Sequence, residues 1–278
     1  MTARGAASLA LVLALTAARP ALVAAADRWE TLEPGLELAE LAMPTASTSG
    51  DSRVTVLRAD PALFELRLLN ASAPDQGAAH SARGWCEQAG LLAAINASMY
   101  QEDLKTSVSL MRTSGHVNNP HLTRDHRAVL AFDPVDESVP AADVIDLTCQ
   151  DFTTLREKYR SFVQSIRMVS CDGKNMWQQQ PRRFSTAAIA VDRSGRVLFI
   201  HCRSPYSTHD FIDGLLALPL DIARAMYVEG GPQAQLYVRA GRREIERVGL
   251  FENPILENDE DQGGWPIPNV VGIARRKP

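Results

Sequence analysis

One carboxylate, Glu229, lies between two apolar runs and is followed directly by Gly230 and Gly231. The run before it, residues 225–228, is typical of a buried strand, so this strand would deliver the acid at its end. Glycine allows a positive φ or a close approach of the backbone to a ligand, and the acid supplies negative charge or a proton acceptor. The same pattern is also typical of a hairpin turn whose glutamate faces water.

A second strand end carries a polar side chain of another type. The short apolar run 91–95 stops at Asn96 and follows a predicted helix that ends at Gly90. An amide and a carboxylate in one cleft would suit sugar hydroxyls, because both side chains can hydrogen-bond to them. Separately, each residue is an ordinary turn residue. The residues alone therefore leave two interpretations of Asn96 and Glu229, one shared sugar site or two unrelated turns.

The elements before Glu229 have clear boundaries. The apolar run 196–202 predicts a strand buried on both faces, and Ser207 is placed to cap a helix that ends before Pro219. Strand, helix and strand in this order predict a right-handed crossover that joins parallel strands. Ligands of such units gather at the carboxyl ends of the strands, which is where Glu229 lies.

The rest of the chain reads mainly as strands. Apolar or alternating runs predict them at 54–57, 63–68, 128–132, 187–191 and 270–273. With only three or four helices, the expected fold class is α+β, with mixed sheets and a few packed helices, including the crossover that leads to Glu229. Hydrophobic residues make up 45% of the chain, and nothing resembles a long linker, so a single domain is expected over residues 27–278.

The N-terminus reads as an export signal. Arg4 precedes the apolar run 9–15, and small residues end in three alanines at 24–26. This pattern predicts a signal peptide over residues 1–26 with cleavage after Ala26, and its apolar part is too short to span a bilayer. No later run is long enough either. The expected protein is therefore exported, periplasmic or extracellular, without stable membrane insertion.

Charge and motif content argue against several classes of function. The chain has 29 basic and 33 acidic residues and no basic stripe, which argues against a nucleic-acid partner. His116, His121 and His126 recur every five residues, a spacing that matches neither one helix face nor one strand face, so no metal site is predicted. No phosphate-binding or dinucleotide-binding fingerprint occurs, so no cofactor is predicted. The sequence predicts no particular oligomeric state.

Four cysteines in an exported chain favour disulfide formation. Cys149 and Cys171 each follow a predicted strand, so adjacent strands could bring them together. This pairing is favoured, although four cysteines permit three pairings. Cys86 and Cys202 lie within apolar patterns and are expected to be buried thiols.

Three motifs together resemble a known family. They are Ala-Ile-Asn-Ala-Ser-Met-Tyr at 94–100, Ala-Ile-Ala-Val-Asp-Arg-Ser-Gly at 188–195 and Tyr-Val-Glu-Gly-Gly at 227–231. In this order, over roughly 54–273, they resemble the phosphodiester glycosidase family. The resemblance implies an exported hydrolase that cleaves a sugar 1-phosphodiester in a glycopolymer or glycolipid and releases free sugar and a phosphomonoester.

The resemblance also implies roles for individual residues. Glu229 would be a base or an electrostatic stabiliser, and Asn96 would hold sugar hydroxyls or phosphate. The expected substrate-binding residues are Gly230, Gly231, Gln233, Tyr100, Ser98, Arg182, Arg183, Asp103 and Lys105.

The chain departs from the family pattern at three positions. Glu229 replaces the usual aspartate, Ser98 occupies a position that is usually glycine, and Thr186 lies where an arginine is expected. Arg182 and Arg183 lie nearby and either bind the phosphate or belong to a solvated loop. The alternative to an enzyme is a non-catalytic envelope protein that binds glycans or phosphorylated sugars in the same pocket.

Overall fold

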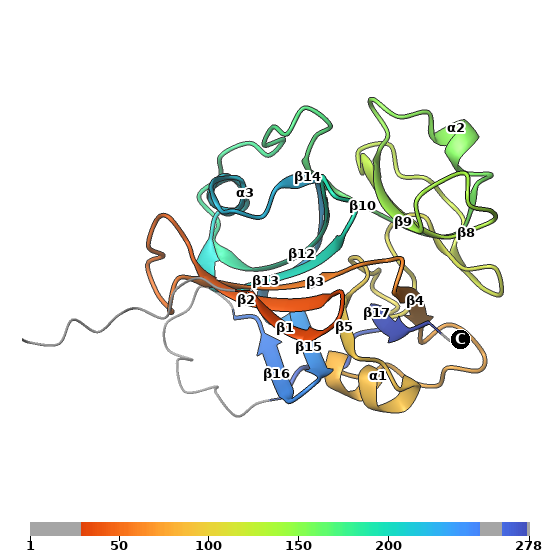
Figure 1. Ribbon diagram of the computed structural model, residues 1–278, viewed down its shortest axis with the longest axis horizontal. Helices are drawn as coiled ribbons and strands as arrows, with labels where there is room; N and C mark the ends of the chain where they lie inside the picture. The colour runs from red at the N-terminus through yellow and green to blue at the C-terminus, as the bar shows by residue number, and fades with distance from the viewer. Residues whose placement is uncertain (1–28, 251–262, 277–278) are drawn as a thin grey trace, which may run out of the picture.

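The computed structural model describes residues 29–250 and 263–276, and the expected signal peptide, residues 1–26, lies outside them. The described chain folds into three sheets in which every strand pairing is antiparallel, with few helices. This is an α+β protein in the broad sense, dominated by antiparallel strands, and the described residues form no mixed sheet of the kind expected from the sequence. Figure 1 shows the three sheets gathered around one centre.

The largest sheet has seven strands. In spatial order they are β1 (Glu30–Glu33), β2 (Leu36–Ala42), β3 (Arg53–Ala59), β13 (Val197–Tyr206), β12 (Phe184–Asp192), β14 (Ile222–Gly230) and β11 (Arg167–Val169). Helix α3 (Thr208–Ala217) covers the face of this sheet that is turned away from β15 and β16 (Figure 1). As expected, Ser207 caps α3 by accepting a hydrogen bond from the Asp210 N–H.

The two smaller sheets have five strands each. One has the order β7 (Val117–Asn119), β6 (Met111–Arg112), β10 (Tyr159–Ser165), β8 (Ala128–Pro134) and β9 (Ala142–Asp146), with the short helix α2 (Phe152–Leu155) beside it. The other has the order β16 (Arg243–Val248), β15 (Gln235–Ala240), β5 (Ala93–Asn96), β17 (Asn269–Arg275) and β4 (Phe64–Asn70). Helix α1 (Ala82–Ala89) packs on this last sheet and ends, as predicted, at Gly90 in the left-handed conformation.

Helix α3 connects β13 to β14, and these two strands run in the same direction but are not neighbours in the sheet. Strand β12 lies between β13 and β14 and pairs with both in antiparallel fashion. The physical reason is the tight turn after β12. The Asp192 carboxylate accepts hydrogen bonds from the N–H groups of Ser194 and Arg196 and so closes a hairpin between β12 and β13. This hairpin inserts a strand between the two that α3 connects.

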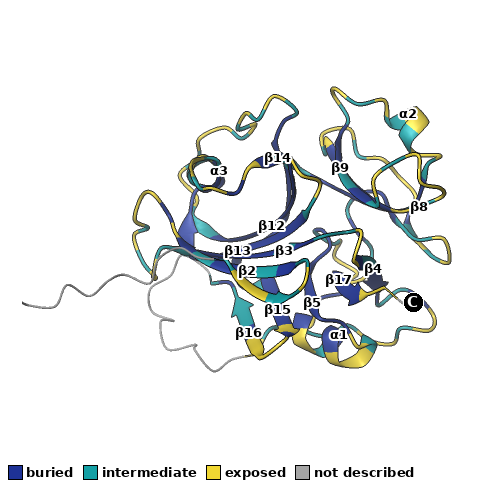
Figure 2. Ribbon diagram, in the orientation of Figure 1, coloured by how far each residue is buried: buried dark blue, intermediate teal, exposed yellow. Residues whose placement is uncertain are grey.

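One hydrophobic core joins the three sheets. Ile95 of β5, Leu130 of β8 and Phe199 of β13 belong to the same cluster, and none of them is exposed. Figure 2 shows the strands as mostly buried and the loops as mostly exposed. A second cluster lies between the seven-stranded sheet and α3, where Ile200 and Phe211 are fully buried. Sheets held on both faces in this way can position loops at their ends accurately.

The disulfide joins Cys149 to Cys171, as expected, and Cys86 and Cys202 are buried free thiols. The strands before the two bonded cysteines are not neighbours in one sheet, because β9 and β11 belong to different sheets. The disulfide therefore links two sheets. Buried Asp146 strengthens this junction, since it accepts two hydrogen bonds from Arg167 at 2.7 and 2.8 Å.

Removal of this disulfide is expected to destabilise the protein. The bond closes a loop over a sequence separation of 22 residues, for which chain entropy predicts a loss of about 3 kcal/mol. Urea unfolding of the double variant Cys149→Ser/Cys171→Ser measures this loss. Cys86→Ser, which alters a free thiol, is the control, because it measures the effect of a cysteine-to-serine change that breaks no disulfide. An unfolding free energy equal to that of the wild type would contradict the assignment.

Candidate functional site

Asn96 ends β5 and holds the turn that follows Glu229. The residue is 1% exposed, its Nδ2 donates to the carbonyl oxygen of Gln233 at 2.8 Å, and its Oδ1 accepts from the Gln235 N–H at 2.7 Å. The Asn96 amide thus bridges the end of the 3-10 helix η1 (Gly231–Gln233) and the start of β15. Two segments that lie far apart in sequence meet here through one buried side chain.

Glu229 lies near the end of β14, at an irregularity in the strand pairing. The register between β12 and β14 shifts there, so that Ala187 pairs with Glu229 whereas Ala188 pairs with Tyr227. An irregularity of this kind gives one strand an extra residue and redirects the following side chains, and such features are frequent beside active sites. The Glu229 side chain is buried, with 7% of the residue exposed.

Burial raises the pKa of the Glu229 carboxyl from its ordinary value of 4.5 to about 7, opposed only by a hydrogen bond from the Gly230 N–H. Among the described residues, no arginine, lysine or histidine forms an ion pair with it. The Glu229 carboxyl is therefore close to half-ionised at neutral pH, which suits a group that must accept or release a proton.

Two tyrosines lie beside this carboxyl. The pKa of Tyr100 is raised by burial and by the charge of Glu229, and a side-chain hydrogen bond with Gln233 opposes this rise. The pKa of Tyr227 is raised by the same two causes, burial first. Both phenols therefore remain protonated at neutral pH and can donate hydrogen bonds. Asn96, Tyr100, Glu229 and Gln233 thus form one connected group around the turn, to which Tyr227 adds a second phenol.

The two glycines after Glu229 are needed for different reasons. Gly230 has an ordinary extended backbone, but a Cβ at this position would overlap the Tyr227 hydroxyl and the ring of Phe184. Gly231 has a φ of 64°, the left-handed conformation that favours glycine. Close approach at the first glycine and a positive φ at the second are the two properties that the sequence indicated for this pair.

Aromatic side chains that were not predicted as site residues border the same place. The Trp177 ring packs on Tyr227 with ring centroids 5.5 Å apart, and Phe184 lies against Gly230. Trp177 comes from the irregular segment 170–183, in which no residue pattern indicates an inward-facing ring. Tyr227 could have been found, because it lies two residues before Glu229 in a predicted strand.

Other predicted substrate-binding residues have their polar groups engaged elsewhere. The Ser98 hydroxyl is buried and donates to the carbonyl oxygen of Gln164. The exposed Asp103 carboxylate accepts hydrogen bonds from the N–H groups of Lys105 and Thr106 and from the Thr106 hydroxyl, and these bonds lower its pKa. Asp103 therefore caps its own loop. Lys105 lies in the same exposed loop.

Arg182 and Arg183 do not join the group around Glu229. Arg182 is exposed, and the charge of Arg183 acts on Asp210 at the start of α3. Within residues 29–250 and 263–276, neither arginine forms a hydrogen bond or an ion pair with Asn96 or Glu229. Thr186, which replaces the expected arginine, pairs with Gly230 across the sheet, and its buried hydroxyl has no hydrogen-bond partner in the described part of the chain.

One described group has the spacing of metal ligands, namely Asp146, Cys149 and Cys171. The two sulfurs form the disulfide, and Asp146 is paired with Arg167. A disulfide sulfur is not the thiolate that binds a metal ion, so these three residues are not available as ligands.

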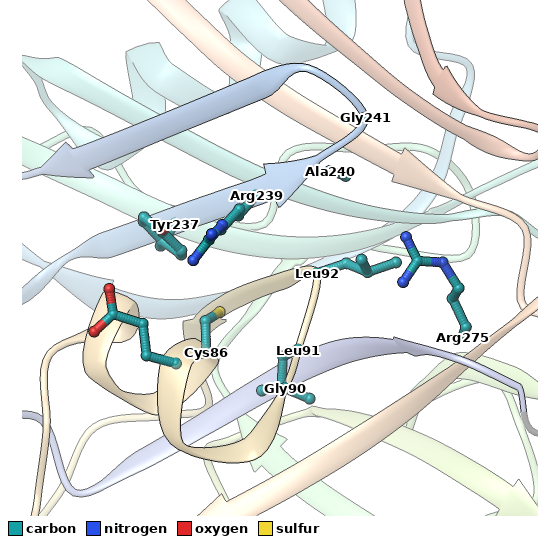
Figure 3. A pocket seen from close by; sticks show the side chains of 10 residues that line it. Cys86, Gly90, Leu91, Leu92, Tyr237, Arg239, Ala240, Gly241 and Arg275 are labelled. Atoms are coloured by element: carbon teal, nitrogen blue, oxygen red, sulfur yellow. The ribbon is translucent and has the colours of Figure 1, made fainter.

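A separate cavity of about 360 Å³ lies at the other end of β5 (Figure 3). It is lined by Cys86, Glu87, Gly90, Leu91, Leu92, Tyr237, Arg239, Ala240, Gly241 and Arg275. Leu92 precedes the first residue of β5, whereas Asn96 is its last, so this cavity and the turn after Glu229 lie at opposite ends of the strand. Residues of this cavity therefore supply control variants for the Glu229 site.

Comparisons with known proteins place these features in a family. The family described as phosphodiester glycosidase matches the chain over residues 89–274. No curated protein matches the chain in sequence. None of the described helices has the length and apolar character needed to span a bilayer.

Three solved structures resemble the chain at low sequence identity. A hypothetical protein from Synechocystis has a TM-score of 0.59 and 12% identity, and the match covers 87% of this chain and 62% of that protein. The catalytic domain of zebrafish N-acetylglucosamine-1-phosphodiester alpha-N-acetylglucosaminidase, auto-inhibited by its pro-peptide, has a TM-score of 0.59 and 11% identity over 89% of this chain and 86% of that one. A putative exported protein from Burkholderia pseudomallei has a TM-score of 0.50 and 10% identity over 80% and 73%. At these identities the likeness shows a shared fold.

Proposed function

The chain belongs to the phosphodiester glycosidase family, and on this basis we propose that it is a hydrolase that cleaves the bond between a sugar C1 and the phosphate of a sugar 1-phosphodiester. The observation that carries the proposal is the buried Glu229 carboxyl, whose pKa is raised to about 7 beside two neutral phenols. The zebrafish relative is named for the same kind of bond. The proposed substrate is therefore a sugar phosphodiester within a glycopolymer or a glycolipid.

The proposed reaction makes modest chemical demands. A phosphate monoester is a good leaving group, so the C1–O bond can break with the electron pair on the phosphate oxygen and without prior protonation. A water oxygen forms the new bond to C1, and ionised Glu229 accepts the proton that the water releases. The low-dielectric surroundings of Glu229 strengthen its interaction with positive charge that develops on the sugar.

Asn96 has a positioning role in this proposal. Its Nδ2 and Oδ1 already bond to Gln233 and Gln235, so it fixes the turn that carries Gly230 and Gly231. We assign sugar contacts first to Tyr100 and Gln233, which lie beside Glu229. Arg182 and Arg183 are proposed as phosphate contacts only for a substrate that extends toward the start of α3.

The proposed site of action is outside the cytoplasm. The disulfide between Cys149 and Cys171 favours an oxidising compartment, and one structural relative is named as a putative exported protein. We propose that residues 1–26 are a signal peptide and that residues 27–278 form one periplasmic or extracellular domain. Sequencing the N-terminus of the secreted protein tests this, and any first residue other than Asp27 would contradict the cleavage site.

The rate is expected to rise with pH through about 7. Glu229 must be ionised to accept a proton, and burial places its pKa near this value. The measurement is kcat for an aryl ester of a sugar 1-phosphate between about pH 5 and pH 9, with release of aryl phosphate followed by chromatography. A kcat that falls through this range would assign the protonated form of Glu229 to the reaction instead.

A specific observation favours the second candidate, a glycan-binding envelope protein without catalysis. No described arginine, lysine or histidine lies against Glu229, so no described positive charge beside this carboxyl would neutralise a bound phosphate. A panel of sugar phosphodiesters and uncharged glycans, incubated with and without a chelator, separates the two functions. Product release supports the hydrolase, whereas glycan affinity by calorimetry without product after long incubation supports the binding protein.

A further inference from the structure

The Tyr227 hydroxyl has an unusual position. It lies directly over Gly230, where an added Cβ would overlap it. The negative charge of Glu229 is close enough to contribute to the raised pKa of this phenol. The residue is 7% exposed. Among the residues that the structure describes, this hydroxyl makes no hydrogen bond.

The ring of Tyr227 is held firmly although its hydroxyl is not bonded. Trp177 packs on one side of it, and the side chain belongs to the hydrophobic cluster under α3. Tyr206 belongs to the same cluster and is 3% exposed, yet its hydroxyl donates to the carbonyl oxygen of Thr45 at 2.7 Å. A phenol that is fixed in place without an acceptor is prepared to bond to a group that arrives from outside.

A second hydroxyl borders the same glycine. Thr186 pairs with Gly230 across β12 and β14, and its Oγ1 is buried without a partner in the described part of the chain. Two buried or nearly buried hydroxyls without acceptors among the described residues thus lie next to the residue that follows Glu229. Buried polar groups are normally bonded, so such a pair indicates a place where a polar ligand completes the bonding.

We propose that Tyr227 is a further catalytic residue whose hydroxyl donates a hydrogen bond to the phosphate oxygen that leaves the sugar. This inference rests on the proposed function. The leaving oxygen gains negative charge as the C1–O bond breaks, and no described cation lies against Glu229 to stabilise that charge. A preorganised neutral donor stabilises such an oxygen without adding a cation that would lower the pKa of the base.

The test compares Tyr227→Phe with Tyr206→Phe. Removal of one preorganised donor to a developing oxyanion lowers kcat by roughly 100-fold. We expect this loss for Tyr227→Phe, with an unchanged Tm and an unchanged midpoint of the pH–rate profile, because Glu229 still titrates. Tyr206→Phe is expected to lower Tm and to keep kcat, because it removes an existing hydrogen bond to Thr45 and no donor to the leaving oxygen.

Two further measurements exclude a merely structural role. Tyr159 is also buried and without a hydrogen bond to a described residue, but it lies beside Asp143 and Arg224, so Tyr159→Phe should keep full activity.

The kcat loss in Tyr227→Phe should also be greater for alkyl phosphate leaving groups than for aryl ones, since the alkyl phosphate oxygen carries more negative charge. Equal kcat in wild type and Tyr227→Phe would overturn the proposal.

A binding measurement separates this inference from the proposed function. If the wild type shows no turnover, calorimetry with phenyl phosphate, a mimic of the leaving group, still tests the contact. At least tenfold weaker binding to Tyr227→Phe than to the wild type supports the contact even if hydrolysis is absent. Equal affinities, or no binding by the wild type, overturn it.

Discussion

Replacement of Glu229 by glutamine is expected to lower kcat by about 100- to 10,000-fold, the range that a general base contributes. Glutamine matches glutamate in shape but cannot accept a proton from water. It also keeps a side-chain oxygen that can accept the Gly230 N–H, so the turn should keep its structure. The measurement is kcat for an aryl ester of a sugar 1-phosphate, with circular dichroism as the test of folding.

Two controls make this result specific. Glu229→Asp keeps the ionisable group but shortens its reach, so it should retain part of the activity. Arg239→Ala alters the exposed cavity at the opposite end of β5 and should keep full activity. Unchanged turnover in Glu229→Gln would remove Glu229 from the mechanism, whatever the controls show.

The same substitution is expected to stabilise the protein at alkaline pH. The pKa of Glu229 is raised from 4.5 to about 7 in the folded state, so the folded chain binds more protons than the unfolded chain between these values. The contribution of Glu229 to stability is fully present below about pH 4.5 and is lost as pH rises through about 7, a loss of about 3 kcal/mol. Glutamine does not titrate and avoids this loss.

Urea unfolding at about pH 4, 6 and 8 measures this effect. The unfolding free energy of Glu229→Gln minus that of the wild type should increase by about 3 kcal/mol from the lowest to the highest pH. Glu87→Gln, which alters an exposed glutamate on α1, should show no comparable trend. A difference that stays constant with pH would mean that the Glu229 carboxyl has an ordinary pKa in the folded protein.

These two expectations describe one compromise. A carboxyl that is buried without a cation costs stability near neutral pH, yet the same burial gives it a pKa suited to proton transfer. Functional residues often reduce stability in this way. A variant that is more stable and inactive is the result that this compromise predicts.

Local features of the fold were predictable from the sequence because they depend on neighbouring residues. Ser207 caps α3, Gly90 ends α1 in the left-handed conformation, and the turn between β12 and β13 is closed by Asp192. Each of these depends on side chains within a few positions. The need for glycine at 230 and 231 was predictable for the same reason.

The arrangement of the sheets was not predictable in this way. Strand β5 pairs with β15 and with β17, which lie more than a hundred residues further along the chain, and no local pattern indicates such partners. The position of β12 between the two strands that α3 connects was not part of the expected crossover, because the periodicity of a strand does not encode its neighbours.

The same distinction applies to the candidate site. The residue types at Asn96 and Glu229 indicated a polar site, but the bonds from Asn96 to Gln233 and Gln235 depend on tertiary contact. The pKa of Glu229 depends on burial by segments far away in sequence, and Trp177 reaches Tyr227 from an irregular loop. Hydrogen-bond partners, pKa shifts and ring contacts that depend on tertiary packing therefore require the structure and cannot be derived from local sequence.

Hydrolysis in H₂¹⁸O tests the central claim most directly, because it identifies the bond that breaks. The substrate is an aryl ester of a sugar 1-phosphate, and mass spectrometry locates the heavy oxygen in the products. Attack of water at the sugar carbon, with Glu229 as base, places the label in the C1 hydroxyl of the released sugar and none in the aryl phosphate. Label in the aryl phosphate would show that water attacks phosphorus, and it would contradict the proposed glycosidase reaction.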